Sequence, residues 1–329
     1  MDNNNNNNDS KILRKIKVSS KKIENKNELE KHYCEQFKKI AEYLINDVIL
    51  YLPKNKKYQI IELEFYFNTL ENNSNDNALL HCDPYSHQHE HQKTSGEWYF
   101  HRVGKFGYRG GTRKGIDITF GNENAYGGIL IRSIKRIIDN EDDDENELIE
   151  GPSLIVDEIL RLCGVDNLSI KEMVEVKWKG KSGICKDFKN FNGMICEEKI
   201  RNFNKRAKYS TGVIGLTLSN TNPSPNLRLN FLLKPYRFFI KPHLIKKGKA
   251  QLIIGLYDRY QDINKVAEIS GTSRSIVENY LKEFKLDSDN IDEFLGKKGK
   301  GSNGMEYCKM AGVVRNWLNN RDNKDVRIF

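Results

Sequence analysis

Two carboxylates and a tyrosine alternate along one short apolar segment of the chain. The stretch 58–67 (YQIIELEFYF) is rich in β-branched and aromatic residues, which predicts a strand. A side-chain period of two places Glu62, Glu64 and Tyr66 on one face of that strand. Carboxylates on an otherwise apolar strand are costly to bury unless they meet water, a partner or a substrate. Either glutamate is therefore a candidate general base.

A second group of chemically capable side chains follows within 81–91. Histidines at 87, 89 and 91 would put three imidazoles on one face if the segment were a strand, and such a set suits a transition metal. The alternative is a solvated loop within a polar insertion. Of the whole group, we expect only His87 to be functional. The group consists of His81, Cys82, Asp83, His87, His89, Glu90 and His91.

Charge is distributed very unevenly along the 329 residues, whose net charge is +9. Eight acidic residues crowd 139–150, whereas 201–250 has eleven Lys or Arg and no acid. A long stretch of one sign needs a counter-charge, and a phosphate backbone is a common one. In YRGGTRKG (108–115), a glycine pair among cations would also let the backbone approach a phosphate. The alternative for 201–250 is a merely soluble basic surface. The alternative for 108–115 is a turn whose cations face solvent.

Apolar patterning predicts an α+β protein: a mixed, mainly antiparallel curved sheet with flanking helices, followed by a small helical domain. Apolar residues three and four apart predict a helix over 27–48, and Pro152 with Gly164 bounds another over 153–163. Besides 58–67, the expected strands are 97–102, 116–120, 128–134, 173–179, 213–218 and 227–240.

The C-terminal part is typical of a helix-turn-helix. Helices are expected at 264–270 and 273–284, with Gly271 in the turn between them. Ser273 and Arg274 would open the second helix and Asn279 would follow a turn later, where base edges and phosphates lie in such motifs. An ordinary helical hairpin is the alternative.

These patterns divide the chain into three parts: a disordered Asn/Lys-rich tail at 1–25, a domain at 26–249 with an acidic loop at 139–150, and a helical domain at 250–329. We expect no membrane association, because no apolar run approaches the roughly 20 residues that a spanning helix needs. The Lys-rich run 11–22 favours a nuclear location over a cytoplasmic one.

Six short sequence segments, in the same order along the chain, resemble one protein family. They are IIELEFY (60–66), DPYSH (83–87), GEWYF (96–100), GILIRSI (128–134), EGPSLIVDEILRLCGV (150–165) and KPYRFFI (234–240). Together they are similar to the catalytic strand and later segments of the alkyladenine-type 3-methyladenine DNA glycosylases, over roughly 58–245. The resemblance implies the fold of that family and hydrolysis of the N-glycosidic bond of a flipped, damaged purine, without metal or other cofactor.

The resemblance also implies roles for single residues. Glu64 would activate water, in preference to Glu62, and Arg132 would steady that water. Tyr66 and His87 would hold the flipped base. Asp117 stands where the family has an Asn, so the pocket would accept a hydrogen bond where the family donates one. The family's basic loop is missing, the interval before His87 is longer, and Tyr108 is the nearest match to the residue that wedges into DNA.

The sequence therefore predicts a monofunctional base-excision enzyme acting on duplex DNA. A non-catalytic nucleic-acid-binding protein on the same fold is one alternative, and a metal-dependent nuclease using His87, His89, His91 and Asp117 is another. Oligomeric state is not predicted. The expected DNA contacts are Tyr108, Arg109, Arg113, Lys114, Lys205, Arg206, Lys208, Ser273, Arg274 and Asn279.

Overall fold

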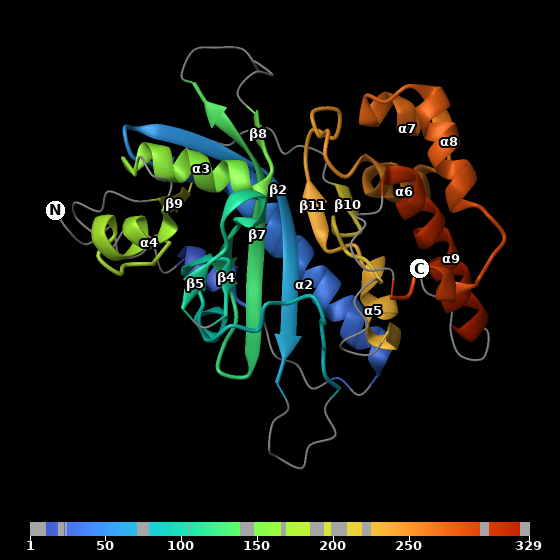
Figure 1. Ribbon diagram of the computed structural model, residues 1–329, viewed down its shortest axis with the longest axis horizontal. Coiled ribbons are helices and arrows are strands. Elements are labelled where there is room, and N and C mark those ends of the chain that lie inside the picture. The colour runs from blue at the N-terminus through green and yellow to red at the C-terminus, as the bar shows by residue number, and fades with distance from the viewer. Residues whose placement is uncertain are drawn as a thin grey trace. The chain divides into compact units, whose positions relative to one another are not determined.

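The chain forms two compact units (Figure 1). The computed structural model describes residues 11–18, 23, 25–70, 79–104, 106–138, 148–165, 169–184, 194–198, 209–218, 225–296 and 303–322. The first unit comprises Met1–His81 and Ser86–Lys208, and the second comprises Cys82–Tyr85 and Tyr209–Phe329. The division therefore falls at Tyr209 rather than at residue 250, and residues 209–249 belong with the helical tail.

An antiparallel sheet organises the first unit, which confirms the predicted α+β class. Its strands run in the order β9-β1-β2-β7-β6-β3, and β8 pairs with β7. They are β1 Val48–Leu52, β2 Lys56–Thr69, β3 Trp98–Phe100, β6 Ile116–Thr119, β7 Ala125–Ile137, β8 Leu148–Glu150 and β9 Ile195–Glu198, and a separate pair is β4 Arg102–Val103 with β5 Gly107–Tyr108. β2 and β7 pair along most of their length and form the centre of the sheet.

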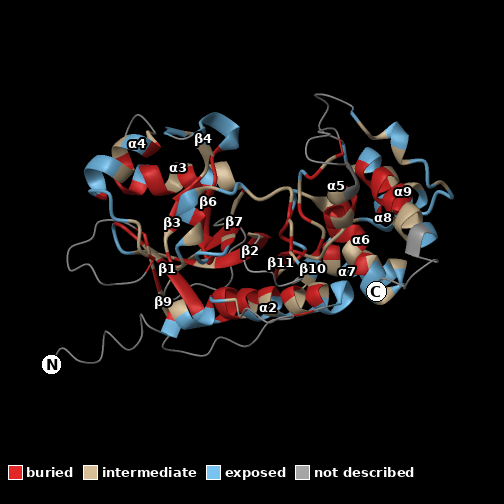
Figure 2. Cartoon of the chain, turned by 90° about the horizontal axis from the view of Figure 1, so that it is seen from below, coloured by how far each residue is buried: buried red, intermediate tan, exposed pale blue. Residues whose placement is uncertain are grey.

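One face of the sheet packs against α2 (Lys26–Asp47), and α3 (Pro152–Leu162) packs on β7 from the other side (Figure 2). The apolar stripe predicted for the first helix is buried, and Phe37 stacks on Phe65 of β2 with ring centroids 4.9 Å apart. Pairs of stacked aromatic rings add about 0.5–1.5 kcal/mol beyond their buried area. This face is therefore the apolar core, which leaves the opposite face of β2 for its polar residues.

Three predictions for the first unit are wrong. Residues 11–15 are helical, with Ile12 and Ile16 buried, so the tail at 1–25 is not disordered throughout. The predicted strand at 173–179 contains the π-helical turn Met173–Lys177, which continues α4 (Ile170–Glu172). The acidic loop ends early, because Leu148–Glu150 is a strand, while 139–147 lies outside the described residues.

The second unit is mostly helical. It contains β10 Tyr209–Thr211, α5 Pro225–Leu232, β11 Arg237–Phe239, α6 Lys249–Tyr260, α7 Ile263–Ser270, α8 Arg274–Phe284 and α9 Gly304–Asp322, and β10 pairs with β11. The predicted strand at 213–218 has no regular structure. The predicted strand at 227–240 instead contains most of α5, followed by β11. A short apolar run suits a buried helix as well as a strand, and Pro225 marks the helix start.

Helices α7 and α8 form the predicted pair of helices with a tight turn. Gly271 adopts φ +60°, a left-handed conformation that glycine takes without a steric penalty. Val266 of α7 and Val277 and Leu281 of α8 are buried, as the spacing requires. Within the described residues, the structure contains no helix long and apolar enough to cross a membrane.

Candidate functional site: two carboxylate clusters on one sheet face

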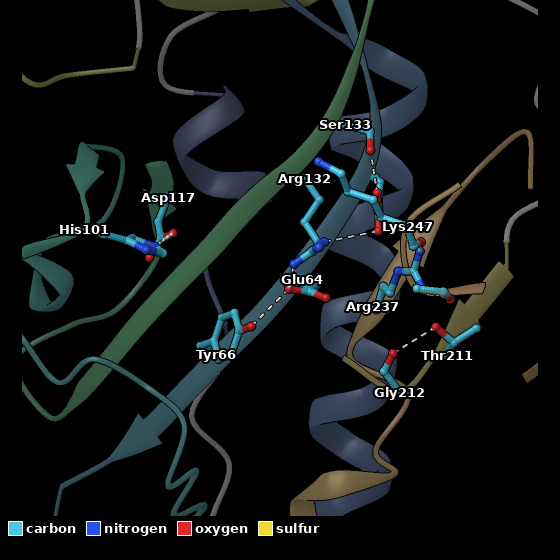
Figure 3. A network of polar contacts seen from close by, with 12 residues as sticks. Glu64, Tyr66, His101, Asp117, Arg132, Ser133, Thr211, Gly212, Arg237 and Lys247 are labelled. Carbon is cyan, nitrogen blue, oxygen red and sulfur yellow. Dashed lines mark hydrogen bonds and ion pairs between the residues drawn. The ribbon is translucent and has the colours of Figure 1, made fainter. Parts of the chain in front are cut away.

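The first cluster joins β2 to β7 through an arginine, and we call it the arginine-bridged cluster: Glu62, Glu64, Tyr66, Arg132 and Ser133. Arg132 Nη1 donates to Glu64 Oε2 at 3.0 Å, and Arg132 Nε lies 3.3 Å from Glu62 Oε1. Tyr66 Oη donates to Glu64 Oε2 at 3.0 Å (Figure 3), and Ser133 Oγ donates to Glu62 Oε2 at 2.5 Å. The predicted common face of Glu62, Glu64 and Tyr66 is confirmed, because one guanidinium reaches both carboxylates.

This cluster is buried, and one of its members, Arg132, is a permanent cation. Glu62 and Glu64 are at most 1% exposed and Arg132 is 9% exposed. Burial disfavours the charged form of Arg132, but the two carboxylates outweigh it and raise the pKa of the guanidinium above its usual value. Both β2 and β7 carry a register irregularity here, between Ile60 and Leu63 on β2. A local bulge re-aims side chains, and this one allows the consecutive residues Arg132 and Ser133 to reach the same pair of glutamates.

The second cluster is bridged by histidine, and we call it the histidine-bridged cluster: His87, His101, Asp117 and Gln92. His101 Nε2 lies 2.8 Å from Asp117 Oδ1, and Gln92 Nε2 donates to Asp117 Oδ2 at 3.2 Å. The rings of His87 and His101 pack edge to face, with centroids 4.3 Å apart. His101 directly follows β3, Asp117 lies on β6, and Gln92 is in the 3₁₀ helix Glu90–Lys93.

Asp117 is 2% exposed, whereas His87 keeps one side open to solvent. The dense surroundings nevertheless desolvate the His87 imidazolium, and with the charge of His101 they lower the pKa of His87 to about 4. His87 therefore stays neutral at neutral pH, with a ring nitrogen able to accept a proton, a hydrogen bond or a metal ion.

The two clusters face the same way across the sheet. Glu64 and Asp117 are both Cα partners of Leu130, so the three residues form one cross-strand row. Directly paired residues point to the same face, and two strand spacings amount to about 10 Å. Figure 3 shows the clusters on either side of β7. The five residues to which the resemblance gives roles therefore lie as two groups on this face. Glu64, Tyr66 and Arg132 form one group, and His87 and Asp117 belong to the other.

The three alternating histidines do not form a shared ligand set. His89 caps the 3₁₀ helix through its side chain and packs beside Tyr99, and His91 lies inside that helix with an exposed side chain. The segment is not a strand, so its alternation puts no three imidazoles on one face. Among the described residues, the side chains close enough to share a metal ion are those of His87, His101 and Asp117.

The expected DNA contacts in the glycine-rich segment 108–115 differ in how accessible they are. The Tyr108 side chain is held in place by Arg102. Arg102 Nη2 donates to the Tyr108 hydroxyl at 3.1 Å, and the guanidinium lies 4.4 Å from the tyrosine ring. Lys114 is buried and ion-paired with Asp157, so it is not available to a phosphate. Arg113 is exposed, and Arg109 Nε donates to the carbonyl of Arg102.

Phe106 is the side chain of this region that the sequence did not single out. It is 81% exposed beside the β4–β5 pair, and Val103 is 62% exposed. Exposed aromatic residues beside cations are typical of surfaces that insert between bases. The signal for Phe106 in the sequence was a large apolar residue between Lys105 and Gly107, in a segment rich in glycine and cations.

Two of the described cations within 201–250 are buried and serve the fold, whereas Lys246 and Lys247 are exposed. Arg237 is fully buried, donates to the carbonyls of Lys247 and Gly248, and lies 5.0 Å from the Phe239 ring. Arg228 is 7% exposed and lies over Tyr85. The expected contacts Lys205, Arg206 and Lys208 lie outside the described residues.

The predicted contacts at the start of α8 are exposed. Ser273, Arg274 and Asn279 all face solvent, and Arg274 pairs with Glu278 at 2.7 Å. Arg274 Nη1 also donates to Asn264 of α7 at 3.0 Å. These weak surface interactions, each worth about 1 kcal/mol or less, leave the guanidinium able to exchange partners.

No family model matches the chain. A stretch of 232 residues, 66% of this chain and 91% of the other, is 31% identical to a protein of Acanthamoeba polyphaga mimivirus described as uncharacterized protein L759. A relationship of this extent covers nearly the whole viral protein. The chain therefore belongs to the family of L759 of Acanthamoeba polyphaga mimivirus.

Proposed function

We propose that the protein hydrolyses the N-glycosidic bond of a base flipped out of DNA, with Glu64 as the general base. The observation that carries the proposal is the arginine-bridged cluster, in which a buried carboxylate is oriented by Arg132 and Tyr66 on the same sheet face as His87 and Asp117. A base must leave the stack before its glycosidic bond is accessible, and a polar face of this kind suits a flipped nucleotide.

In the proposed step, Glu64 accepts a proton from water as the water oxygen bonds to C1′. The C1′–N bond breaks, and the departing base takes the bonding electron pair. Arg132 keeps Glu64 oriented and lies close to the water that Glu64 would hold. Tyr66 is partly exposed and in contact with Glu64, so it marks the side from which the nucleotide approaches.

Glu64 is a better candidate than Glu62 because of its neighbours. Glu62 is turned toward Ser133, at 2.5 Å, whereas Glu64 contacts the partly exposed Tyr66 and shares the cross-strand row with Asp117. The carboxylate of Asp117 accepts hydrogen bonds, so a base with donor groups on its edge fits this pocket best.

Two further surfaces support DNA as the partner. Phe106 presents an exposed ring close in sequence to the cations Arg109 and Arg113, which suits insertion into a base step. In the second unit, the α7–α8 pair exposes Ser273 and Arg274 at the start of the second helix, where a helix-turn-helix contacts DNA.

The test incubates the full chain with duplexes that carry alkylated or deaminated purines and then cleaves abasic sites with alkali. We expect product from at least one lesion and a loss of about 100- to 10,000-fold in the single-turnover rate for Glu64→Gln, the usual contribution of a general base. Glu62→Gln is the matched control in the same cluster and should lose much less. An exposed control, Glu175→Gln, should change nothing.

A non-catalytic nucleic-acid-binding protein is the second candidate, favoured by the exposed start of α8. It would bind duplex DNA without releasing any base, and Glu64→Gln would leave binding unchanged. Arg274→Ala should reduce the salt slope of binding by about 1 if this helix contacts a phosphate. An unchanged slope would remove α8 from the interface.

A further inference from the structure

The histidine-bridged cluster brings three side chains of metal-ligand type together from separate segments. His87 comes from the loop after residue 85, His101 from the end of β3, and Asp117 from β6. Their ligand atoms all lie within 4.8 Å of one another. Two ligands of one tetrahedral zinc ion are about 3.3 Å apart, given metal–ligand bonds near 2.0–2.2 Å. Small side-chain rotations would therefore close the set around an ion.

The charge balance of the cluster also indicates a cation. Asp117 is almost completely buried, and among the described residues its hydrogen-bond partners are Gln92 and His101, neither of which carries a permanent charge. The glutamates on the same sheet face are instead ion-paired with Arg132, which is permanently charged. A buried carboxylate is costly unless it is paired or coordinates a metal.

His87 supplies an accessible ligand. Within the part of the chain that the structure describes, its ring nitrogens make no hydrogen bond, and its side chain is exposed on one side. Its ring packs edge to face against that of His101, the second imidazole of the set, with centroids 4.3 Å apart. The open side leaves room for water or a substrate to complete the coordination.

A second layer of contacts fixes the carboxylate. The backbone N–H of His89 donates to Gln92 Oε1 at 3.3 Å, which turns the amide nitrogen of Gln92 toward Asp117. Beneath the carboxylate, a Cβ on Gly128 would stand 2.5 Å from Asp117 Oδ2 and 2.6 Å from Gln92 Nε2. Outer partners of this kind orient ligands in metal sites and raise affinity.

We propose that His87, His101 and Asp117 bind one divalent first-row transition-metal ion of the zinc class, with Gln92 as a positioning residue. Two imidazole nitrogens and one carboxylate oxygen are the donors that zinc takes in sites with an open position, and they disfavour magnesium and calcium, which prefer oxygen alone. The ion would lie at the Asp117 end of the cross-strand row of Glu64, Leu130 and Asp117, where the proposed function places the flipped base. The metal proposal does not rest on that function.

The test uses the full chain, free of any polyhistidine tag, stripped with a chelator and titrated with Co²⁺ and Zn²⁺. We expect one Co²⁺ per chain, seen as d–d absorption bands, and its displacement by Zn²⁺ in calorimetry. His101→Gln and Asp117→Asn should abolish the bands, and Gln92→Leu should weaken binding by about 10- to 100-fold. Near-ultraviolet circular dichroism checks that each variant is folded.

His91→Gln is the matched control, since His91 is an exposed histidine in the neighbouring 3₁₀ helix and not a member of the set. It should bind Co²⁺ as the wild type does. Glu64→Gln should also keep the bands, so failure of hydrolysis and failure of metal binding are separate results. Absence of stoichiometric binding by the wild type, or equal losses in His91→Gln and His101→Gln, would overturn the proposal.

Discussion

The arginine-bridged and histidine-bridged clusters solve the same electrostatic problem in different ways. Both place carboxylates with almost no exposed surface on the polar face of one sheet. Glu62 and Glu64 have a guanidinium that is charged at every physiological pH, whereas Asp117 has an imidazole and an amide. The arginine-bridged cluster therefore has a cation whose charge is fixed. The positive charge beside Asp117 instead depends on a proton or a metal ion.

The largest effect should come from removing the fixed charge. Arg132→Ala removes the guanidinium that pairs with two buried carboxylates, and we expect it to lower the free energy of unfolding by about 3–5 kcal/mol. Urea denaturation measures this. The control is Arg161→Ala, which breaks an ion pair whose arginine side chain is 62% exposed and should cost about 1 kcal/mol or less. Equal losses in the two variants would show that Arg132 stabilises the fold no more than an exposed arginine does, which contradicts the role given to it.

A metal ion should stabilise the histidine-bridged cluster alone. Zinc at about 100 times its dissociation constant should raise the stability of the wild type by about 2.7 kcal/mol through mass action. We expect the same gain in Glu64→Gln and none in Asp117→Asn. Thermal unfolding with zinc and with chelator measures the difference, and a gain that survives in Asp117→Asn contradicts the assignment.

The histidine-bridged cluster can also be perturbed sterically, without substituting any of its proposed ligands. Gly128→Ala puts a methyl group into the space of Asp117 Oδ2 and Gln92 Nε2. Overpacking of this kind costs about 1–3 kcal/mol, and it should weaken Co²⁺ binding as well. Gly110→Ala is the matched control, because a Cβ there meets no atom within 4 Å.

The smallest effect concerns pH. His87 has its pKa lowered from 6.5 to about 4, so the folded chain binds that proton less readily than the unfolded chain. Without metal, stability should therefore fall as the pH drops from about 6.5 toward 4, and the contribution is fully present above 6.5. His87→Gln should flatten this part of the profile. A profile identical to the wild type would show that His87 does not titrate in this range.

Sequence patterns located the polar face of β2 well and its partners less well. The period of two identified Glu62, Glu64 and Tyr66, because a strand with one apolar face fixes the direction of every other side chain. His101 was missed even though it lies two residues after Tyr99, the Cα partner of Asp117. Its nearness to His87 depends on a loop path, which no local pattern encodes.

Local sequence patterns also gave wrong predictions where the same residues are compatible with two kinds of structure. Ile12 and Ile16 are spaced for one helix face, but the lysines around them indicated disorder. The apolar run at 227–240 predicted one strand where the chain forms α5 and then β11. Arg228 and Arg237 counted toward a basic surface although both are buried, because net charge says nothing about which cations the fold itself uses.

The order in which the chain contributes to the two units limits which fragments can be produced and when the second unit can fold during synthesis. Cys82–Tyr85 belongs to the second unit, and the ring of Tyr85 lies under Arg228, far later in the sequence. A fragment beginning at Tyr209 would lack this segment, so the second unit cannot be obtained as one continuous piece. During synthesis, Tyr85 leaves the ribosome long before its partner, and the second unit is completed only after Arg228 has been made.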